Sequence, residues 1–176
     1  MAEFSAFGIA GARVDRIAEA AGCNKNLIYV YFDNKETLFV TVLRNNFERF
    51  YDKLPVVAED LPSYAADLFD FAMANSDLMR LLAWANLERR ASVHEERMAS
   101  INHKLSILEK AEQAGAISGA FPAKALLTLI LTIAAAWSEA NPFGHLVPPA
   151  ARDSHAILRQ MVMSAIRLLI AAPATP

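Results

Sequence analysis

Turn-forming residues are scarce in this chain. Its 176 residues include six glycines and eight prolines, whereas 55% of the residues are apolar. A many-stranded β fold needs frequent turns, while the abundant alanine and leucine are strong helix formers. The composition therefore predicts an all-α fold. The length fits one domain, or a small module fused to a larger one.

Composition also excludes several classes of protein. The single cysteine, Cys23, excludes an intrachain disulfide framework or a cysteine-based zinc cluster within one chain. The longest uncharged apolar stretch, Ala125–Ser138, has 14 residues, fewer than the roughly 20 that a membrane-spanning helix needs. No signal peptide is visible, so we expect a cytoplasmic protein with no membrane partner.

Charge is nearly balanced along the chain. The formal net charge is −2, and residues 1–53 carry seven basic and seven acidic groups. A nucleic-acid-binding domain usually has a basic surplus. Charge alone therefore argues weakly against DNA binding.

Apolar periodicity divides the N-terminal third into short helices. An apolar stripe from Val14 predicts a helix of about eight residues that ends at Gly22, because glycine tolerates a left-handed conformation there. Asn24 is placed to cap a second helix that ends near Phe32, and Asn34 to cap a third that ends before Pro55. Ser76 is the expected cap of a later helix. The further helices are expected after Pro62 and over about 77–91, 93–114, 123–140 and 152–171.

The two short helices around Gly22 have the spacing of a helix-turn-helix. Ala18 lies four residues before Gly22, where a small side chain lets the helices cross closely, and Cys23 and Ile28 can supply apolar contacts. In this motif the second helix enters the DNA major groove. An ordinary helical hairpin within a core remains the alternative.

The same residues resemble a known family. The run RVDRIAEAAGCNKNLIYVYFDNKETLFVTVL, from Arg13 to Leu43, is similar to the DNA-binding segment of the tetracycline-repressor (TetR-like) transcriptional regulators. The segment DLMRLLAWANLE, 77–88, resembles one subgroup of their C-terminal domains. The resemblance implies a DNA-binding domain over 1–53 and a helical ligand-binding and dimerisation domain over 54–176, with about nine helices in all.

The resemblance also implies the residues that contact DNA. Residues at the start of the second helix would approach base edges, since asparagine can pair with adenine and apolar side chains can touch a thymine methyl. Its tyrosines and the flanking basic residues would meet phosphates. Half-buried packing of the tyrosines and plain solvated charge on the lysines are the alternatives. The predicted DNA-binding residues are Arg13, Lys25, Asn26, Leu27, Tyr29, Val30, Tyr31 and Lys35.

One departure from the family pattern concerns the first helix. Family members usually have a complete helix before the segment Phe4–Gly8, whereas Met1 leaves only about two turns here. We therefore expect a truncated first helix. An N-terminal segment omitted from the sequence is favoured over a weakened DNA-binding module, because the missing burial would cost about as much as the stability margin of a small domain.

The last two predicted helices are apolar on more than one side. A helix that faces only its own core needs one apolar stripe, so the second stripe predicts a homodimer in which two helices from each chain form a four-helix bundle. A fully buried hairpin in a monomer is the alternative. The predicted dimerisation residues are Leu126, Ile130, Trp137, Ile157, Met161 and Leu168.

The middle helices combine apolar side chains with a few polar groups, which suits a small-molecule cavity. Core packing explains the same residues. A ligand that preferred one tilt of the helix after Asn34 would change the separation of the recognition helices and so switch DNA binding. The predicted ligand-binding residues are Phe69, Met73, Trp84, Met98, Asn102 and Leu105.

No metal, cofactor or enzyme motif is apparent. The four histidines form no i, i+4 pair, and neither a glycine-rich phosphate loop nor a nucleophile elbow occurs. The hypothesis is a dimeric regulator, a repressor by preference, that binds a palindromic double-stranded operator and responds to a small, mostly apolar effector. The rival hypothesis is a dimeric ligand-binding or adaptor protein that has lost DNA binding.

Overall fold

The computed structural model of the chain describes residues 1–50, 54–88, 91–117, 120–151 and 154–171, with side chains at 47–50 and 91–99 excepted. This part of the chain contains helices and no strand, which confirms the all-helical prediction. Short 3-10 turns occupy Ala58–Asp60 and Pro149–Ala151. The α-helices are α1 (Ala2–Gly11), α2 (Val14–Ala20), α3 (Lys25–Phe32), α4 (Lys35–Phe50), α5 (Leu61–Ala74), α6 (Ser76–Leu87), α7 (Ala91–Gln113), α8 (Ala123–Ala134) and α9 (His155–Ala171).

Local side-chain caps fix the starts of α3 and α4. The Asn24 Oδ1 atom accepts a hydrogen bond of 2.9 Å from the backbone N–H of Asn26, and the Asn34 Oδ1 atom accepts one of 2.8 Å from the N–H of Thr37. Each bond satisfies a backbone donor that lacks a partner within the helix. Both predicted caps are therefore confirmed.

Several helix ends differ from the prediction. Helix α6 starts at Ser76, with Asn75 rather than Ser76 at the cap position, and ends at Leu87 instead of residue 91. Helix α8 ends at Ala134, six residues before the predicted end. Helix α9 starts at His155 rather than near residue 152.

The early end of α8 has a local cause. The Asn141 side-chain amide donates a hydrogen bond of 2.6 Å to the backbone oxygen of Ala136, and the Ser138 hydroxyl donates one of 2.9 Å to the backbone oxygen of Ala135. Asparagine and serine compete with the helix for backbone groups in this way. Residues 135–146 therefore form a series of turns, and Trp137 lies in this connection instead of on α8.

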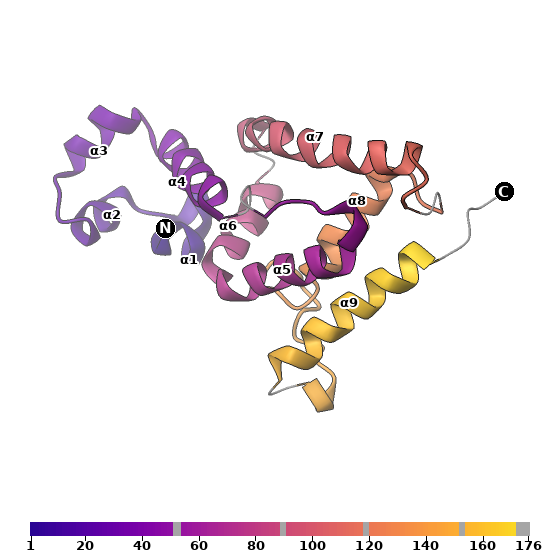
Figure 1. Ribbon diagram of the computed structural model, residues 1–176. Helices are drawn as coiled ribbons and strands as arrows, with labels where there is room; N and C mark the ends of the chain where they lie inside the picture. The colour runs from indigo at the N-terminus through magenta and orange to yellow at the C-terminus, as the bar shows by residue number, and fades with distance from the viewer. Residues whose placement is uncertain (51–53, 89–90, 118–119, 152–153, 172–176) are drawn as a thin grey trace.

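Two hydrophobic clusters build the interior. The first joins α1–α4 and includes the α6 residues Leu78, Leu81, Leu82 and Ala85. The second is formed by α5, α7, α8 and α9. Helices α1–α4 lie at one end of the molecule, and α6 lies between them and the helices of the other end (Figure 1). Helix α6 thus contributes to the core beneath the N-terminal helices, although it follows them by some 25 residues in sequence.

Helix α1 is short and kinked. Its residues up to Phe7 make about two turns, and Gly8 then has φ 65° and ψ −174°, which are not helical values. Phe4 is 1% exposed and its ring packs edge-on against Phe39 of α4, with centroids 5.2 Å apart. The kinked helix is therefore anchored to the N-terminal core. Among the described helices, none has both the length and the apolar character to cross a bilayer.

Candidate nucleic-acid interface

Helices α2 and α3 are joined by a tight turn. Gly22 has φ 64°, in the left-handed region that glycine favours, and the Cys23 N–H closes the turn with a 3.0 Å bond to the oxygen of Ala18. Ala18 and Ile28 are 4% and 7% exposed, and Cys23 packs against the same cluster. The small residue, the turn glycine and the inward apolar contacts therefore occupy the places that a helix-turn-helix requires.

The outer face of α3 is unusually apolar for an exposed helix. Leu27 and Tyr29 are 46% and 41% exposed, and Val30 and Tyr31 are 78% and 75% exposed. Asn26 is also exposed beside them. The 75% exposure of Tyr31 is contrary to the half-buried alternative for that residue. Clustered large apolar side chains at a protein surface mark a face that meets a partner.

The lysines near this face make contacts within the chain. Lys25 Nζ lies 2.9 Å from Asp15 Oδ1. This hydrogen bond and the Asp15 charge raise the pKa of Lys25, and the same bond lowers the pKa of Asp15. Lys35 Nζ donates to the backbone oxygens of Ala10 and Ala12, at 3.2 and 3.1 Å. Lys35 therefore also ties the start of α4 to the end of α1.

Glu3 connects α1 to α2, a role that the sequence did not indicate. Its Oε1 atom accepts from the backbone N–H of Arg13 at 2.8 Å and from Arg16 Nε at 2.9 Å. The Arg16 guanidinium lies 4.4 Å from the centre of the Phe7 ring. The backbone of Arg13, which begins α2, is thus positioned by α1, while its side chain is exposed.

The Glu3 contacts predict a stability difference that depends on pH. Partial desolvation raises the pKa of Glu3, but the hydrogen bonds from Arg13 and Arg16 outweigh it and leave that pKa below its ordinary value of 4.5. A lowered carboxylate pKa stabilises the folded state above the unfolded pKa, and the effect disappears as pH falls through the folded pKa. We expect Glu3→Gln to lower the free energy of unfolding at pH 7, with the difference closing below about pH 4.5.

Urea unfolding from pH 3 to pH 7 measures this difference, with Glu19→Gln on the exposed side of α2 as the control for loss of one carboxylate. A Glu3→Gln deficit of equal size at both ends of the range would contradict the assignment.

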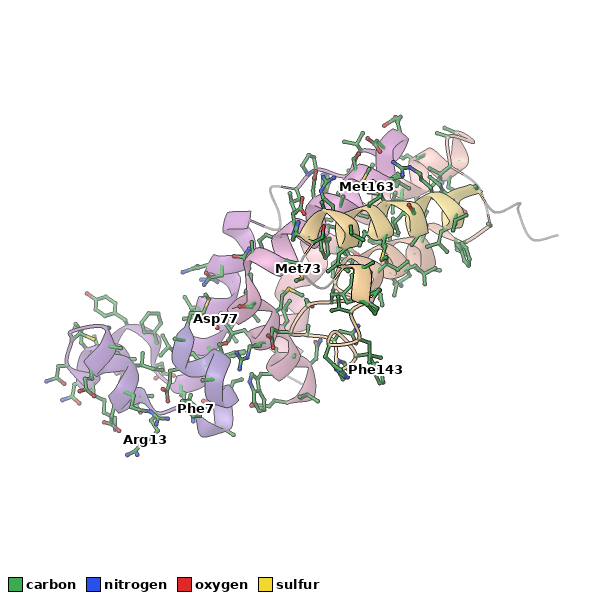
Figure 2. All side chains as sticks on the ribbon, turned by 90° about the horizontal axis from the view of Figure 1, so that it is seen from below. Phe7, Arg13, Met73, Asp77, Phe143 and Met163 are labelled. Atoms are coloured by element: carbon green, nitrogen blue, oxygen red, sulfur yellow. The ribbon has the colours of Figure 1, made fainter. Side chains whose placement is uncertain are left out.

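Helix α6 contacts the kink of α1 through three side chains. The Trp84 Nε1–H donates to the backbone oxygen of Ser5 at 3.1 Å, and Glu88 Oε1 accepts from the N–H of Ile9 at 3.0 Å. Ser5 Oγ donates to Asp77 Oδ1 at 2.9 Å. Asp77 lies between the end that carries Phe7 and Arg13 and the end that carries Met163 (Figure 2). Trp84, predicted as a ligand-binding residue, instead lies on the face of α6 that meets α1.

A cavity of about 240 Å³ lies among α5, α6 and the end of α8. Its wall is mostly apolar and includes the polar residues Asn86 and Thr132. Much of this wall could not be predicted from the sequence, because it is formed by alanines at 72, 134, 135 and 140, and alanine gives no signal for a site. The lining residues are Leu68, Phe71, Ala72, Met79, Leu82, Asn86, Leu131, Thr132, Ala134, Ala135 and Ala140.

Among the predicted ligand-binding residues whose side chains the structure describes, none lines this cavity. Phe69 is fully buried and packs against the Trp137 and His155 rings. Leu105 packs against the second cluster. Met73 is 36% exposed and Asn102 is exposed. The side chain of Met98 is outside the described residues.

The predicted dimerisation residues divide into two groups. Leu126 and Ile130 are 2% and 0% exposed because they pack in the second cluster of a single chain, so they occupy core positions instead of a free face. Trp137 also packs against that cluster, and its Nε1–H donates to the oxygen of Leu146 at 3.4 Å. The α9 residues Ile157, Met161 and Leu168 are exposed by 37%, 36% and 75%.

Within the described residues, no group of three or more histidine, cysteine or acidic side chains could hold a metal ion. The outer face of α3 and the cavity among α5, α6 and α8 are two candidate binding features of the described residues.

Comparison with family models covers most of the chain. Residues 1–42 match the model described as bacterial regulatory proteins of the tetR family. Residues 60–167 match the model of the tetracyclin repressor-like C-terminal domain. The two matches flank the connection between α4 and α5, and the first contains the whole of α1–α3.

Individual proteins give the same result. The chain is 38% identical to the HTH-type transcriptional repressor SCO4008 of Streptomyces coelicolor over 137 residues, which are 76% of this chain and 71% of that protein. It is 28% identical to the HTH-type transcriptional repressor NicS of Pseudomonas putida over 127 residues, 67% of this chain and 60% of NicS.

Solved structures agree on the fold. The transcriptional regulator SCO4942 of Streptomyces coelicolor superposes with a TM-score of 0.84 at 33% identity, covering 97% of this chain and 93% of that one. FadR of Bacillus subtilis, solved in complex with stearoyl-CoA, superposes with a TM-score of 0.70 at 20% identity, covering 96% of this chain and 92% of FadR. Together with the helix-turn-helix geometry of α2 and α3, these matches show that the chain belongs to the TetR family of transcriptional regulators.

Proposed function

We propose that this regulator is a ligand-responsive repressor that binds a palindromic operator as a homodimer. The observation that carries the proposal is the outer face of α3, where Leu27, Tyr29, Val30 and Tyr31 are exposed beside Asn26. We assign DNA binding to residues 1–53, and effector binding and dimerisation to 54–176. Repression is supported by the relatives SCO4008 and NicS, both of which are named transcriptional repressors.

Each residue type on α3 has a distinct part in DNA binding. Asn26 has the geometry to pair with adenine, and Leu27 and Val30 are suited to a thymine methyl. Tyr29, Tyr31 and Arg13 are suited to phosphates. Lys25 and Lys35 would exchange their contacts with Asp15 and the α1 carbonyls for phosphate oxygens. The list of proposed DNA contacts is therefore Arg13, Lys25, Asn26, Leu27, Tyr29, Val30, Tyr31 and Lys35.

The dimer interface is proposed on the outer side of α9. Ile157, Met161 and Leu168 are separated by four and seven residues, so they share one face of the helix. Their exposure supports burial against a second copy. In such a dimer, two recognition helices one DNA turn apart, about 34 to 36 Å, would read the two halves of a palindrome.

The effector is proposed to occupy the cavity among α5, α6 and α8. Its volume of about 240 Å³ equals roughly eight water molecules at about 30 Å³ each, and a cavity of about 150 Å³ is enough for benzene. The apolar wall with Asn86 and Thr132 suits a small, neutral, ring-sized molecule that has one or two hydrogen-bonding groups.

FadR of Bacillus subtilis is 20% identical to this chain, so its likeness concerns the fold alone, and its stearoyl-CoA ligand is not assigned to this cavity.

A gel-shift titration tests the proposal. We expect the protein to bind DNA from immediately upstream of its own gene at least about 10³-fold more tightly than a shuffled fragment of equal length and composition. The affinity should fall as salt rises, because phosphate contacts release counterions. Equal affinity for both fragments would contradict the proposal and favour a ligand-binding or adaptor protein without operator recognition.

A further inference from the structure

Two opposite faces of helix α6 make different contacts. Met79, Leu82 and Asn86 line the cavity, whereas Trp84 and Glu88 contact α1. At 3.6 residues per turn, residues 79, 82 and 86 point to one side of the helix, and residues 77, 84 and 88 point to the other. Helix α6 thus carries part of the cavity wall on one side and the contacts with α1 on the other.

Side chains on the side of α6 that faces α1 replace a backbone hydrogen bond that the kink in α1 breaks. In a regular helix the Ile9 N–H would donate to the backbone oxygen of Ser5, but the non-helical φ and ψ of Gly8 interrupt the helix between them. Glu88 Oε1 accepts from the Ile9 N–H, and the Trp84 Nε1–H donates to the Ser5 oxygen. Two side chains from α6 therefore satisfy both halves of the missing bond.

The ring of Trp84 also covers the kink. A Cβ atom built on Gly8 would lie 2.8 Å from Trp84 Cε3, so no side chain fits between the two helices. Ser5, which lies in the same contact, is 2% exposed. Unpaired backbone groups in such a buried position are costly. In this position α6 therefore stabilises the kinked form of α1.

We propose that Trp84 and Glu88 are positioning residues that hold the α1 kink, and that an effector pressing on the opposite face of α6 loosens their hold. This inference rests on the proposed function. The movement would reach DNA through α1, because Glu3 positions the start of α2 and Phe4 packs on α4. The cavity and α3 would thus be coupled through α6 and α1.

A cavity-filling substitution can imitate the effector. Ala135→Leu places a larger side chain in the cavity wall, and Ala114→Leu at the exposed end of α7 is the matched control. The chain has two tryptophans, so Trp137→Phe leaves Trp84 as the sole fluorescent indole. Operator affinity and Trp84 emission are then measured on the same full-length proteins, with Ala135→Val as the smaller filling variant if the leucine variant does not fold.

The expected result is a coupled change. Ala135→Leu should weaken operator binding about tenfold and shift Trp84 emission to longer wavelength, whereas Ala114→Leu should change neither. In a Glu88→Ala protein, adding Ala135→Leu should weaken operator binding by less than about twofold, because the link from the Glu88 carboxylate to α1 is already gone. In a Glu88→Gln protein, Ala135→Leu should still weaken operator binding, because the glutamine amide oxygen can accept from the Ile9 N–H.

Two outcomes would overturn the inference. One is an equal effect of Ala135→Leu with and without Glu88, and the other is an unchanged Trp84 emission in the filled protein. Failure of the parent protein to distinguish operator from shuffled DNA is a separate result, and it would refute the proposed function itself.

Discussion

Gly8→Ala is expected to lower the free energy of unfolding by about 2 to 6 kcal/mol. Gly8 has φ 65° and ψ −174°, a region that is almost restricted to glycine and costs other residues about 1 to 3 kcal/mol. The new methyl group would also lie 2.8 Å from the Trp84 ring, and overpacking of this kind adds about 1 to 3 kcal/mol. Urea unfolding followed by circular dichroism measures the loss.

Gly115→Ala is the matched control for this prediction. Gly115 also has a positive φ, 70°, but a Cβ atom there meets nothing within 4 Å. Its substitution should therefore cost only the backbone strain of a positive φ, about 1 to 2 kcal/mol. Combining Gly8→Ala with Trp84→Ala removes the clash but leaves the backbone strain. Equal losses at Gly8 and Gly115 would show that the contact with α6 contributes nothing.

Local signals predicted the DNA-binding helices well. Asn24 and Asn34 cap helices through backbone groups two or three residues away, so their effect is encoded in a short stretch of sequence. Gly22 likewise acts within its own turn. The same reasoning extended α8 too far, because the Asn141 side chain takes a backbone carbonyl from the apolar run that precedes it.

Contacts between distant residues were beyond the reach of sequence patterns. The link from Glu88 to Ile9 spans 79 positions, and nothing in the local sequence of either residue marks it. An apolar stripe also does not reveal what it faces: Ile130 packs inside the chain, while Leu168 is 75% exposed. Trp84 illustrates both limits, since it fits an apolar pattern in α6 but contacts α1.

Asn26→Ala is expected to cause the largest loss of operator affinity among single substitutions on α3. A side-chain amide paired with adenine contributes about 1 to 3 kcal/mol of discrimination. A palindromic operator would contain this contact twice, so the dimer would lose about 2 to 6 kcal/mol, or roughly 30-fold to more than 10⁴-fold in affinity. Fluorescence anisotropy with labelled operator DNA measures the change.

Specificity separates this effect from general damage. The cap of α3 uses the backbone N–H of Asn26 and the side chain of Asn24, so it survives Asn26→Ala, and the exposed position leaves the core intact. Stability and affinity for shuffled DNA should therefore remain unchanged. Tyr29→Phe removes a hydroxyl that is proposed to contact a phosphate. It should instead lower the affinity for operator and for shuffled DNA by the same factor. If Asn26→Ala instead lowered the affinity for both DNAs equally, Asn26 would contact the DNA backbone, and Leu27 and Val30 would be left to recognise the bases.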